Sequence, residues 1–220
     1  MQKLIDLSHT IINGMVTHKG LPPPIVCDYL SREDSRKNYT EGTEFQIGRI
    51  DMVANTGTYI DCPFHRYAGG KDLSEMPLER FFGIPTVVVR AGHLRRTEIR
   101  ATDFEGTDVS GKAVLVHTGW SDRWGTPDYL EDHPFLTHDA AAYLRDRGAV
   151  LVGIDSHNID DTRTKNSRPA HTVLLGAEIL IVEHLRGLEL LPDQGIQFSA
   201  VPPKWKGVGT FPVRAFAQIV

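Results

Sequence analysis

Cysteine is scarce in this chain: Cys27 and Cys62 are the only two among its 220 residues. Two cysteines cannot build the disulfide framework of a small secreted domain, so we expect a reducing, cytoplasmic setting. The opening MQKLIDLSHT agrees with this, because it turns polar too early for a signal peptide. Long apolar runs are missing as well. Since a membrane-spanning helix needs about 20 apolar residues in a row, we expect no membrane partner.

An excess of basic charge is also missing. The chain has 24 Lys and Arg against 28 Asp and Glu, a formal net charge of −4. Nucleic-acid-binding proteins present a basic face, so we expect a small-molecule substrate and no nucleic acid as the partner. The sequence contains no G-x-S-x-G nucleophile elbow, H-E-x-x-H zinc motif, P-loop or G-x-G-x-x-G dinucleotide loop. It does contain ten histidines, and the question is which of them do chemistry.

Short runs rich in β-branched residues alternate with a few helical segments. Strands are predicted at residues 45–53, 86–90, 113–117, 149–154, 178–182 and 213–220. A helix is predicted at residues 137–147, with Thr137 as its N-cap and Gly148 as its end, and shorter helical turns at 171–177 and 183–188. The polar stretch 31–42 is predicted to be a mobile flap or lid. This pattern favours one α/β domain over residues 1–220, with a mixed β-sheet core and flanking helices.

The densest polar motif is NTGTYIDCPFH, residues 55–65. Pro63 forbids a regular helix there and favours an extended chain, in which Asn55, Tyr59, Asp61 and His65 face one side. Such a line of polar groups can bind a metal or a polar small molecule. The alternative is a Gly/Pro-rich turn with a capping Asp and a surface His. Cys62 is the weaker candidate for a nucleophile, because this short extended segment does not by itself aim a His at the thiol.

Two further polar clusters follow apolar strands. The segment 153–161, GIDSHNIDD, stands at a strand's C-terminal end, where α/β sheets usually place their sites. Asp155 and His157 are either site residues or parts of a turn, whereas Asp160 and Asp161 are expected in a solvated turn. His171 precedes one apolar run and Glu183 ends another, and each is either a site residue or a structural group. Four other histidines are expected at the solvated surface: His18, His93, His133 and His138.

Six separated segments stand in an order that resembles one known family. They read IDLSHTIINGM, NTGTYIDCPFH, VLVHTGWSDRW, VGIDSHNID, ILIVEHLRGL and FPVRAFAQIV. Together they resemble the cyclase family that includes bacterial kynurenine formamidase and isatin hydrolase. The resemblance implies an α/β enzyme domain with a mixed sheet, assembled as a homodimer or homotetramer.

In that family the central motif is H-x-G-T-H-x-D-x-P-x-H. The resemblance implies that Asp61 is a metal ligand, that His65 is a general acid/base, and that the pair His171 and Glu183 completes a second metal position. The first two histidines of the motif are Asn55 and Tyr59 here. Both are poor zinc ligands, so we expect no cofactor. A residual zinc or manganese site on Asp61, His171 and Glu183 is the alternative.

Three functions follow from these residues. The first is metal-independent or metal-altered acid/base chemistry on a small carbonyl compound, such as ring closure, dehydration or proton transfer. In it Asp61 and His65 act with His171 or Glu183, and Tyr59 and Asn55 donate to an oxyanion. The second is metal-dependent hydrolysis of an amide, formamide or lactam. The third is non-catalytic binding of a small molecule. Trp120 and Phe64 are predicted either to wall a planar substrate or to pack in the core.

Overall fold

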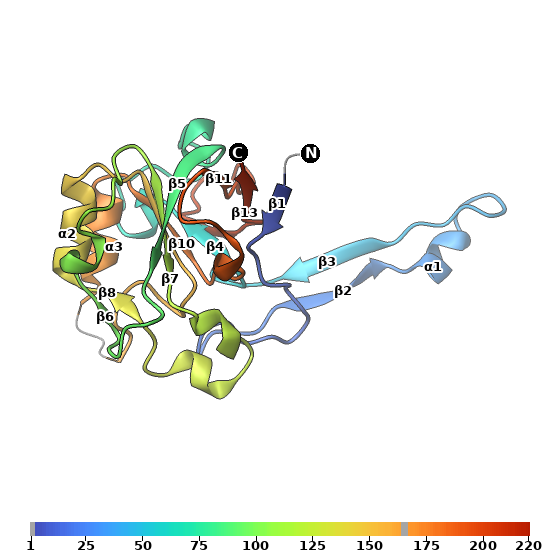
Figure 1. The fold of residues 1–220 in the computed structure, drawn as a ribbon. Coiled ribbons are helices and arrows are strands. Elements are labelled where there is room, and N and C mark those ends of the chain that lie inside the picture. Colours follow the sequence, from blue (N-terminus) through green and yellow to red (C-terminus); the bar gives the residue numbers. More distant parts are fainter. Residues whose placement is uncertain (1–2, 164–166) are drawn as a thin grey trace.

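A computed structural model describes residues 3–163 and 167–220 of the chain, and within them a nine-stranded mixed sheet dominates (Figure 1). Its strands β5, β7, β9 and β10 are parallel, and the remaining neighbours pair antiparallel. The order across the sheet is β1 (Lys3–Asp6), β13 (Phe216–Ile219), β11 (Ile196–Ser199), β5 (Ile84–Arg90), β7 (Ala113–His117), β9 (Leu151–Ile154), β10 (Leu180–Glu183), β4 (Tyr59–Asp61) and β12 (Thr210–Pro212). The predicted α/β fold with a mixed sheet is confirmed.

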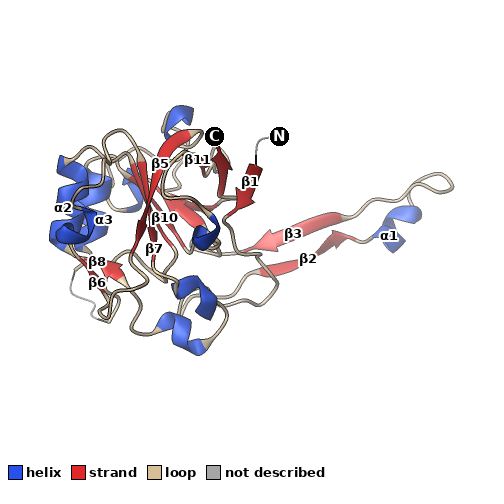
Figure 2. Cartoon of the chain, in the orientation of Figure 1, coloured by secondary structure: helices blue, strands red, loops and turns tan. Residues whose placement is uncertain are grey.

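The central strands are apolar on both faces because both faces are covered. Along β7, Val114 and Val116 belong to one core cluster and Leu115 to the other. The first cluster lies under the helices α2 (His138–Asp146) and α3 (Pro169–Gly176), which pack together on one face of the sheet (Figure 2). The second cluster fills the opposite face and includes residues of the flanking strands β1, β4, β11 and β13.

The helix predicted at 137–147 is confirmed as α2, with the Thr137 hydroxyl accepting from the Ala140 N–H as an N-cap. The turn predicted at 171–177 coincides with the end of α3, whose last residue is Gly176 and whose C-cap is Ala177. The turn predicted at 183–188 is wrong: Glu183 is the last residue of β10, and Gly187, with φ +70°, begins a separate 3-10 turn. Among the described residues, no helix has the length and apolar character to cross a bilayer. The short 3-10 helices are Pro63–His65, Leu78–Arg80, Ala101–Phe104, Trp120–Arg123, Pro127–Leu130 and Leu188–Leu190.

A two-stranded arm projects from the body (Figure 1). It pairs β2 (Ile25–Leu30) with β3 (Ile47–Asp51), and helix α1 (Arg32–Arg36) lies near its tip. The strand predicted at 45–53 is shorter than expected, and all of its residues from Ile47 to Asp51 are exposed. The predicted flap at 31–42 contains α1. A second small sheet joins β6 (Glu98–Ile99) to β8 (Phe135–Leu136).

The register of three adjacent strands brings the polar residues together. In the order β10, β4, β12, Glu183 pairs with Tyr59, and Asp61 pairs with Thr210. Cross-strand partners have neighbouring side chains, so this register alone places two buried carboxylates beside a phenol and a hydroxyl. The strand register thus brings residues of the central motif next to Glu183 and Thr210.

Candidate active site

Asp61 is the buried centre of the site. Its side chain has no solvent exposure, and its Oδ1 accepts a hydrogen bond from the Thr210 hydroxyl. Its Oδ2 has no hydrogen-bond partner and lies 3.7 Å from His171 Nε2. Burial would raise the pKa of Asp61, but the charges of His65 and His171 and the Thr210 hydrogen bond outweigh it and lower that pKa. Asp61 is therefore an ionised carboxylate with one oxygen still to satisfy.

Thr210 fixes the orientation of His65. The Thr210 hydroxyl donates its single proton to Asp61. His65 Nδ1 lies 2.6 Å from the Thr210 hydroxyl oxygen. His65 must then donate through Nδ1–H, so a neutral ring keeps the lone pair on Nε2. Gly209 permits this approach, because a Cβ there would lie 2.3 Å from the His65 backbone nitrogen. Thr210 and the buried Asp61 thus fix the orientation of the His65 ring, which can act as a base through Nε2.

His171 is held among three carboxylates. Its Nδ1 lies 2.6 Å from Asp160 Oδ2, and its Nε2 lies 3.8 Å from Glu183 Oε1. Burial would lower the pKa of His171, but the Asp160 hydrogen bond and the charges of Asp61 and Glu183 raise it to about 10. Asp160 also accepts the backbone N–H groups of Ala170 and His171 at the start of α3. The expectation that Asp160 lies in a solvated turn is therefore wrong, because it is fully buried as the partner of this helix end and of His171.

Glu183 lies behind Tyr59. Its carboxylate accepts from the Tyr59 hydroxyl, from the Ile159 N–H at 2.6 Å and from Asn158 Nδ2 at 3.3 Å. Burial raises the pKa of Glu183 to about 7, although the charge of His171 opposes the rise. Burial and the charge of Glu183 also raise the pKa of Tyr59 well above its usual value, so the phenol stays protonated. The Tyr59 hydroxyl thus donates its hydrogen bond to Glu183 and accepts one from His18 Nε2 at 2.9 Å.

These groups border a cavity of about 540 Å³. Seven neutral or titratable polar residues line it: His18, Asn55, Tyr59, His65, Asn158, Ser167 and His171. Arg66 and Arg168 line it too, and none of the described Asp or Glu residues does. A cavity lined in this way suits a compact polar molecule that carries negative charge.

The structure gathers most of the residues that the sequence selects. Asn55, Tyr59, His65 and His171 line the cavity, with Asp61 and Glu183 buried behind them. It does not bring Phe64 or Trp120 to this cavity: Phe64 packs against the sheet core, and the Trp120 indole donates to the Tyr129 carbonyl.

Three other predictions from the sequence resolve plainly. The Cys62 thiol is no nucleophile here, because it is buried and burial raises its pKa to about 12. Asp155 holds the turn after β7, accepting the N–H groups of Thr118 and Gly119. His18 and His133 were expected at the solvated surface, and this is wrong: His133 is 3% exposed, and His18 is half-buried against Tyr59.

Sequence reasoning misses Thr210, Asn158 and His18. Thr210 lies in the segment GVGTFP, where only the paired glycines hint at a close backbone approach. Asn158 lies inside the GIDSHNIDD segment, so the signal of polar residues after an apolar strand does reach it. His18 lies in a polar stretch far from the other site residues in sequence, and no local pattern marks it.

The donors present fit a divalent metal. Ligand atoms of Asp61, His65 and His171 lie within 4.8 Å of one another, and the unpartnered Asp61 Oδ2 is the oxygen that a cation would satisfy. Two imidazoles and one carboxylate form a ligand set of catalytic zinc. The residual set expected from the sequence used Glu183 in place of His65. Both Glu183 oxygens already accept hydrogen bonds, so His65 is the better third ligand.

Comparison with known proteins agrees with this site. The model of the Cyclase family matches residues 5–161. The chain belongs to the cyclase family. It is 30% identical over 183 residues to the kynurenine formamidase of Geobacillus thermodenitrificans, covering 82% of this chain and 84% of that protein. It is 27% identical over 216 residues to the kynurenine formamidase of Bacillus anthracis, covering 97% and 96%.

Solved structures of cyclase-family proteins share its fold. A structure described as a potential metal-dependent hydrolase with cyclase activity superposes with a TM-score of 0.82 at 28% identity, over 100% of this chain and 99% of that one. Isatin hydrolase A from Labrenzia aggregata, bound to benzyl benzoate, gives a TM-score of 0.83 at 25% identity, over 99% and 94%. The resemblance found in the motifs is confirmed, and the chain is an enzyme of the hydrolase or cyclase type.

Proposed function

We propose that this enzyme hydrolyses the carbon–nitrogen bond of a small formamide or lactam that carries a carboxylate, in a metal-altered version of the cyclase-family site. The observation that carries the proposal is the chain Asp61–Thr210–His65, which leaves His65 Nε2 as a base at a cavity wall. A base oriented by a second group, itself held by a buried carboxylate, is the arrangement that general acid/base catalysis needs.

His65 would serve both halves of the reaction. Its Nε2 takes a proton from a water molecule as that water's oxygen bonds to the carbonyl carbon. The same nitrogen then gives the proton to the leaving nitrogen as the carbon–nitrogen bond breaks. Of the two amides in the cavity wall, Asn158 donates to Glu183 at 3.3 Å, so Asn55 is the better donor to the developing oxyanion; the Tyr59 proton is likewise already donated to Glu183.

A divalent metal held by Asp61, His65 and His171 would supply a Lewis acid for the carbonyl and lower the pKa of a nearby water. With His65 as a ligand, the base would have to be a neighbouring group, so metal content and the His65 assignment must be tested together. The replacement of two expected histidines by Asn55 and Tyr59 is the reason for proposing an altered site.

The chemistry of the cavity supports the substrate class. Arg66 and Arg168 favour a carboxylate on the substrate. The names of the relatives point to a formamide in one case and to isatin, a lactam, in the other. A cavity of about 540 Å³ has the size of a site for a small molecule of this kind.

Ring closure or dehydration is the second candidate. Asn55 and Tyr59 favour it, because neither reaction needs an activated water and both tolerate the loss of metal-ligating imidazoles. Both candidates need the same acid/base residue, so a variant of that residue does not separate them. They are separated by whether an oxygen from water enters the product.

The experiment measures turnover of N-formyl amino acids and of carboxylate-bearing lactams in ¹⁸O-labelled water. Hydrolysis predicts one labelled oxygen in the product acid, and ring closure predicts none. His65→Gln should lower kcat/KM by about 10²–10⁴-fold, the usual contribution of a positioned acid/base. His138→Gln, at a surface position with a 64% exposed side chain, is the matched control and should leave kcat/KM unchanged. Turnover that His65→Gln leaves intact would contradict the assignment, and binding without any turnover would favour the non-catalytic function.

We also propose that the enzyme works as a homodimer or homotetramer in a reducing cytoplasm. The arm exposes Ile25, Tyr29, Phe45, Ile47 and Ile50, a concentration of apolar surface that a second copy would cover. The two cysteines are unpaired, which suits a reducing compartment. Light scattering after size exclusion tests the assembly, and a monomer at micromolar concentration would contradict it.

A further inference from the structure

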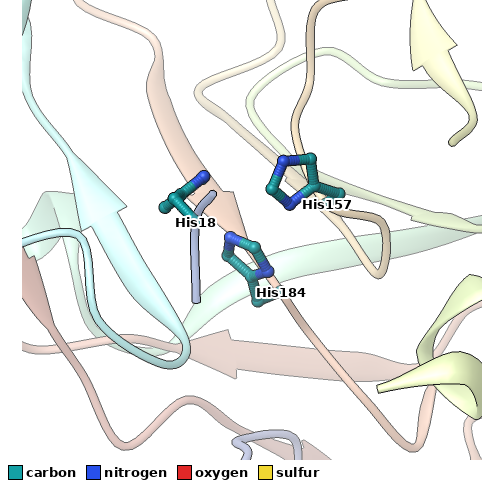
Figure 3. A group of neighbouring side chains, drawn as sticks. All are labelled: His18, His157 and His184. Atoms are coloured by element: carbon teal, nitrogen blue, oxygen red, sulfur yellow. The ribbon is translucent and has the colours of Figure 1, made fainter. Parts of the chain in front are cut away.

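Three histidines from separate parts of the chain meet beside Tyr59. His18 lies between β1 and β2, His157 follows β9, and His184 follows β10. Ring centroids of His18 lie 4.8 Å from His157 and 5.1 Å from His184, and a nitrogen of each ring lies within 4.8 Å of the others. Figure 3 shows the three rings gathered with a nitrogen of each on the side that faces the group. None of the three has a role in the proposed reaction.

Two ring nitrogens of this group have no hydrogen-bond partner among the described residues. His157 Nδ1 and His184 Nε2 are buried and make no hydrogen bond. The other nitrogen of His184, Nδ1, is 2.8 Å from the Tyr129 hydroxyl. A buried polar atom without a partner is costly, and two of them facing one group indicate a missing ligand.

Hydrogen bonds outside the group also set the tautomers that a metal needs. Tyr59 gives its proton to Glu183, so it accepts from His18 Nε2–H and leaves the Nδ1 lone pair of His18 free. Tyr129 can accept from His184 Nδ1–H in the same way, which frees the lone pair on the unpartnered Nε2. Metal-binding histidines are commonly held by such a contact through the nitrogen that does not bind.

The surroundings keep the imidazoles neutral. Aromatic rings of Tyr59, Tyr129 and Trp124 and the ring of His133 enclose the group. Burial lowers the pKa of His18 to about 4 and of His157 to about 3, and it lowers the pKa of His184 well below its usual value. The charge of Asp61 raises the pKa of His18 but does not outweigh the effect of burial. Near neutral pH all three rings therefore have a lone pair to offer.

We propose that His18, His157 and His184 bind a divalent transition metal, zinc above all, at a site distinct from Asp61, His65 and His171. Imidazole nitrogen suits zinc, cobalt, nickel and copper, whereas magnesium and calcium require oxygen ligands. Three histidines with a fourth position open form a catalytic type of zinc site. His18 also lines the cavity, so this metal would lie at the cavity wall behind Tyr59. The inference stands apart from the proposed reaction.

The backbone at His184 gives the best test variant. His184 has φ +57°, in the left-handed region that Asn adopts more readily than most residues. His184→Asn therefore keeps the backbone and removes the imidazole, and His157→Gln does the same at a position with ordinary backbone. His65→Gln reports on the other donor set, and exposed His138→Gln is the control for the loss of any histidine.

The experiment strips the full chain with a chelator, adds Zn²⁺ or Co²⁺, and measures bound metal after dialysis together with the visible spectrum of Co²⁺. We expect His157→Gln and His184→Asn each to lose one equivalent and the tetrahedral Co²⁺ bands, whereas His138→Gln keeps both and His65→Gln keeps the equivalent that the three histidines bind. Tyr129→Phe should weaken binding by about 10–100-fold, as the loss of an outer hydrogen bond usually does. Circular dichroism checks that each variant folds.

X-ray absorption of the zinc-loaded wild type gives a measurement that needs no variant. We expect a first shell with three imidazole nitrogens. Absence of bound metal at micromolar zinc, or metal that only His65→Gln removes and whose first shell contains carboxylate, would overturn the proposal.

Discussion

His171 and His157 are almost equally buried, with 6% and 5% exposure, yet their pKa values shift in opposite directions. His171 faces Asp160, Asp61 and Glu183, and its pKa is raised to about 10. His157 lies among histidine and tyrosine rings, and burial lowers its pKa to about 3. Burial disfavours the charged form of both histidines, so the carboxylates around His171 account for the opposite directions of the two pKa shifts. Two histidine clusters on either side of Tyr59 can therefore do different chemistry.

The largest expected effect comes from His171, which lies among the buried carboxylates. His171→Gln removes the cation and leaves Asp61 and Asp160 buried without it, which should cost about 3–5 kcal/mol in the free energy of unfolding. His157→Gln in metal-free protein removes a neutral ring and should cost about 1–3 kcal/mol. Urea unfolding at pH 7 measures both. Equal losses for the two variants would break the comparison.

The stabilisation that His171 provides should decrease as the pH rises. Because the pKa of His171 is raised from 6.5 to about 10, its stabilising charge is fully present below pH 6.5 and is lost as the pH rises through 10. The difference in unfolding free energy between wild type and His171→Gln should therefore shrink from pH 7 to pH 10. A difference that stays constant over that range would show that His171 stabilises by packing alone.

A smaller effect is expected at the boundary between the clusters. Tyr59→Phe removes the hydroxyl that donates to Glu183 and accepts from His18, and should cost about 1–3 kcal/mol, because both partners stay partly unsatisfied. Tyr143→Phe, at a half-buried position of α2, is the matched control and should change stability by less than about 0.5 kcal/mol. Urea unfolding again supplies the measurement, and a Tyr59→Phe protein as stable as wild type would mean that the two clusters are not joined through this phenol.

The sheet was the predictable part of the fold. Runs such as AVLVH and LIVE are apolar on both faces, and such runs form strands covered on two sides, as β7 and β10 are. The arm was not predictable in the same way. The alternating pattern around β3 is typical of a half-buried strand, but β3 is exposed along its whole length in the structure.

The candidate site was predictable where its residues are close in sequence. Tyr59, Asp61 and His65 stand in one motif, and the strand register that adds Glu183 follows from the sheet. Asp160 looked solvated because its partners, His171 and the start of α3, come ten or more residues later and fold back onto it. The group of His18, His157 and His184 was beyond local patterns, since its members are joined only by tertiary packing.

The most direct test of the contrast between the two clusters is the protonation of these histidines in solution. Nitrogen-15 NMR of histidine-labelled, metal-free protein at pH 7 distinguishes a charged ring from a neutral one, and the His171→Gln and His157→Gln variants assign the two signals. We predict that His171 carries protons on both ring nitrogens and that His157 keeps one unprotonated nitrogen. A neutral His171, or a His157 that is charged at pH 7, would contradict the division of the two clusters into an acidic centre and a neutral metal-binding group.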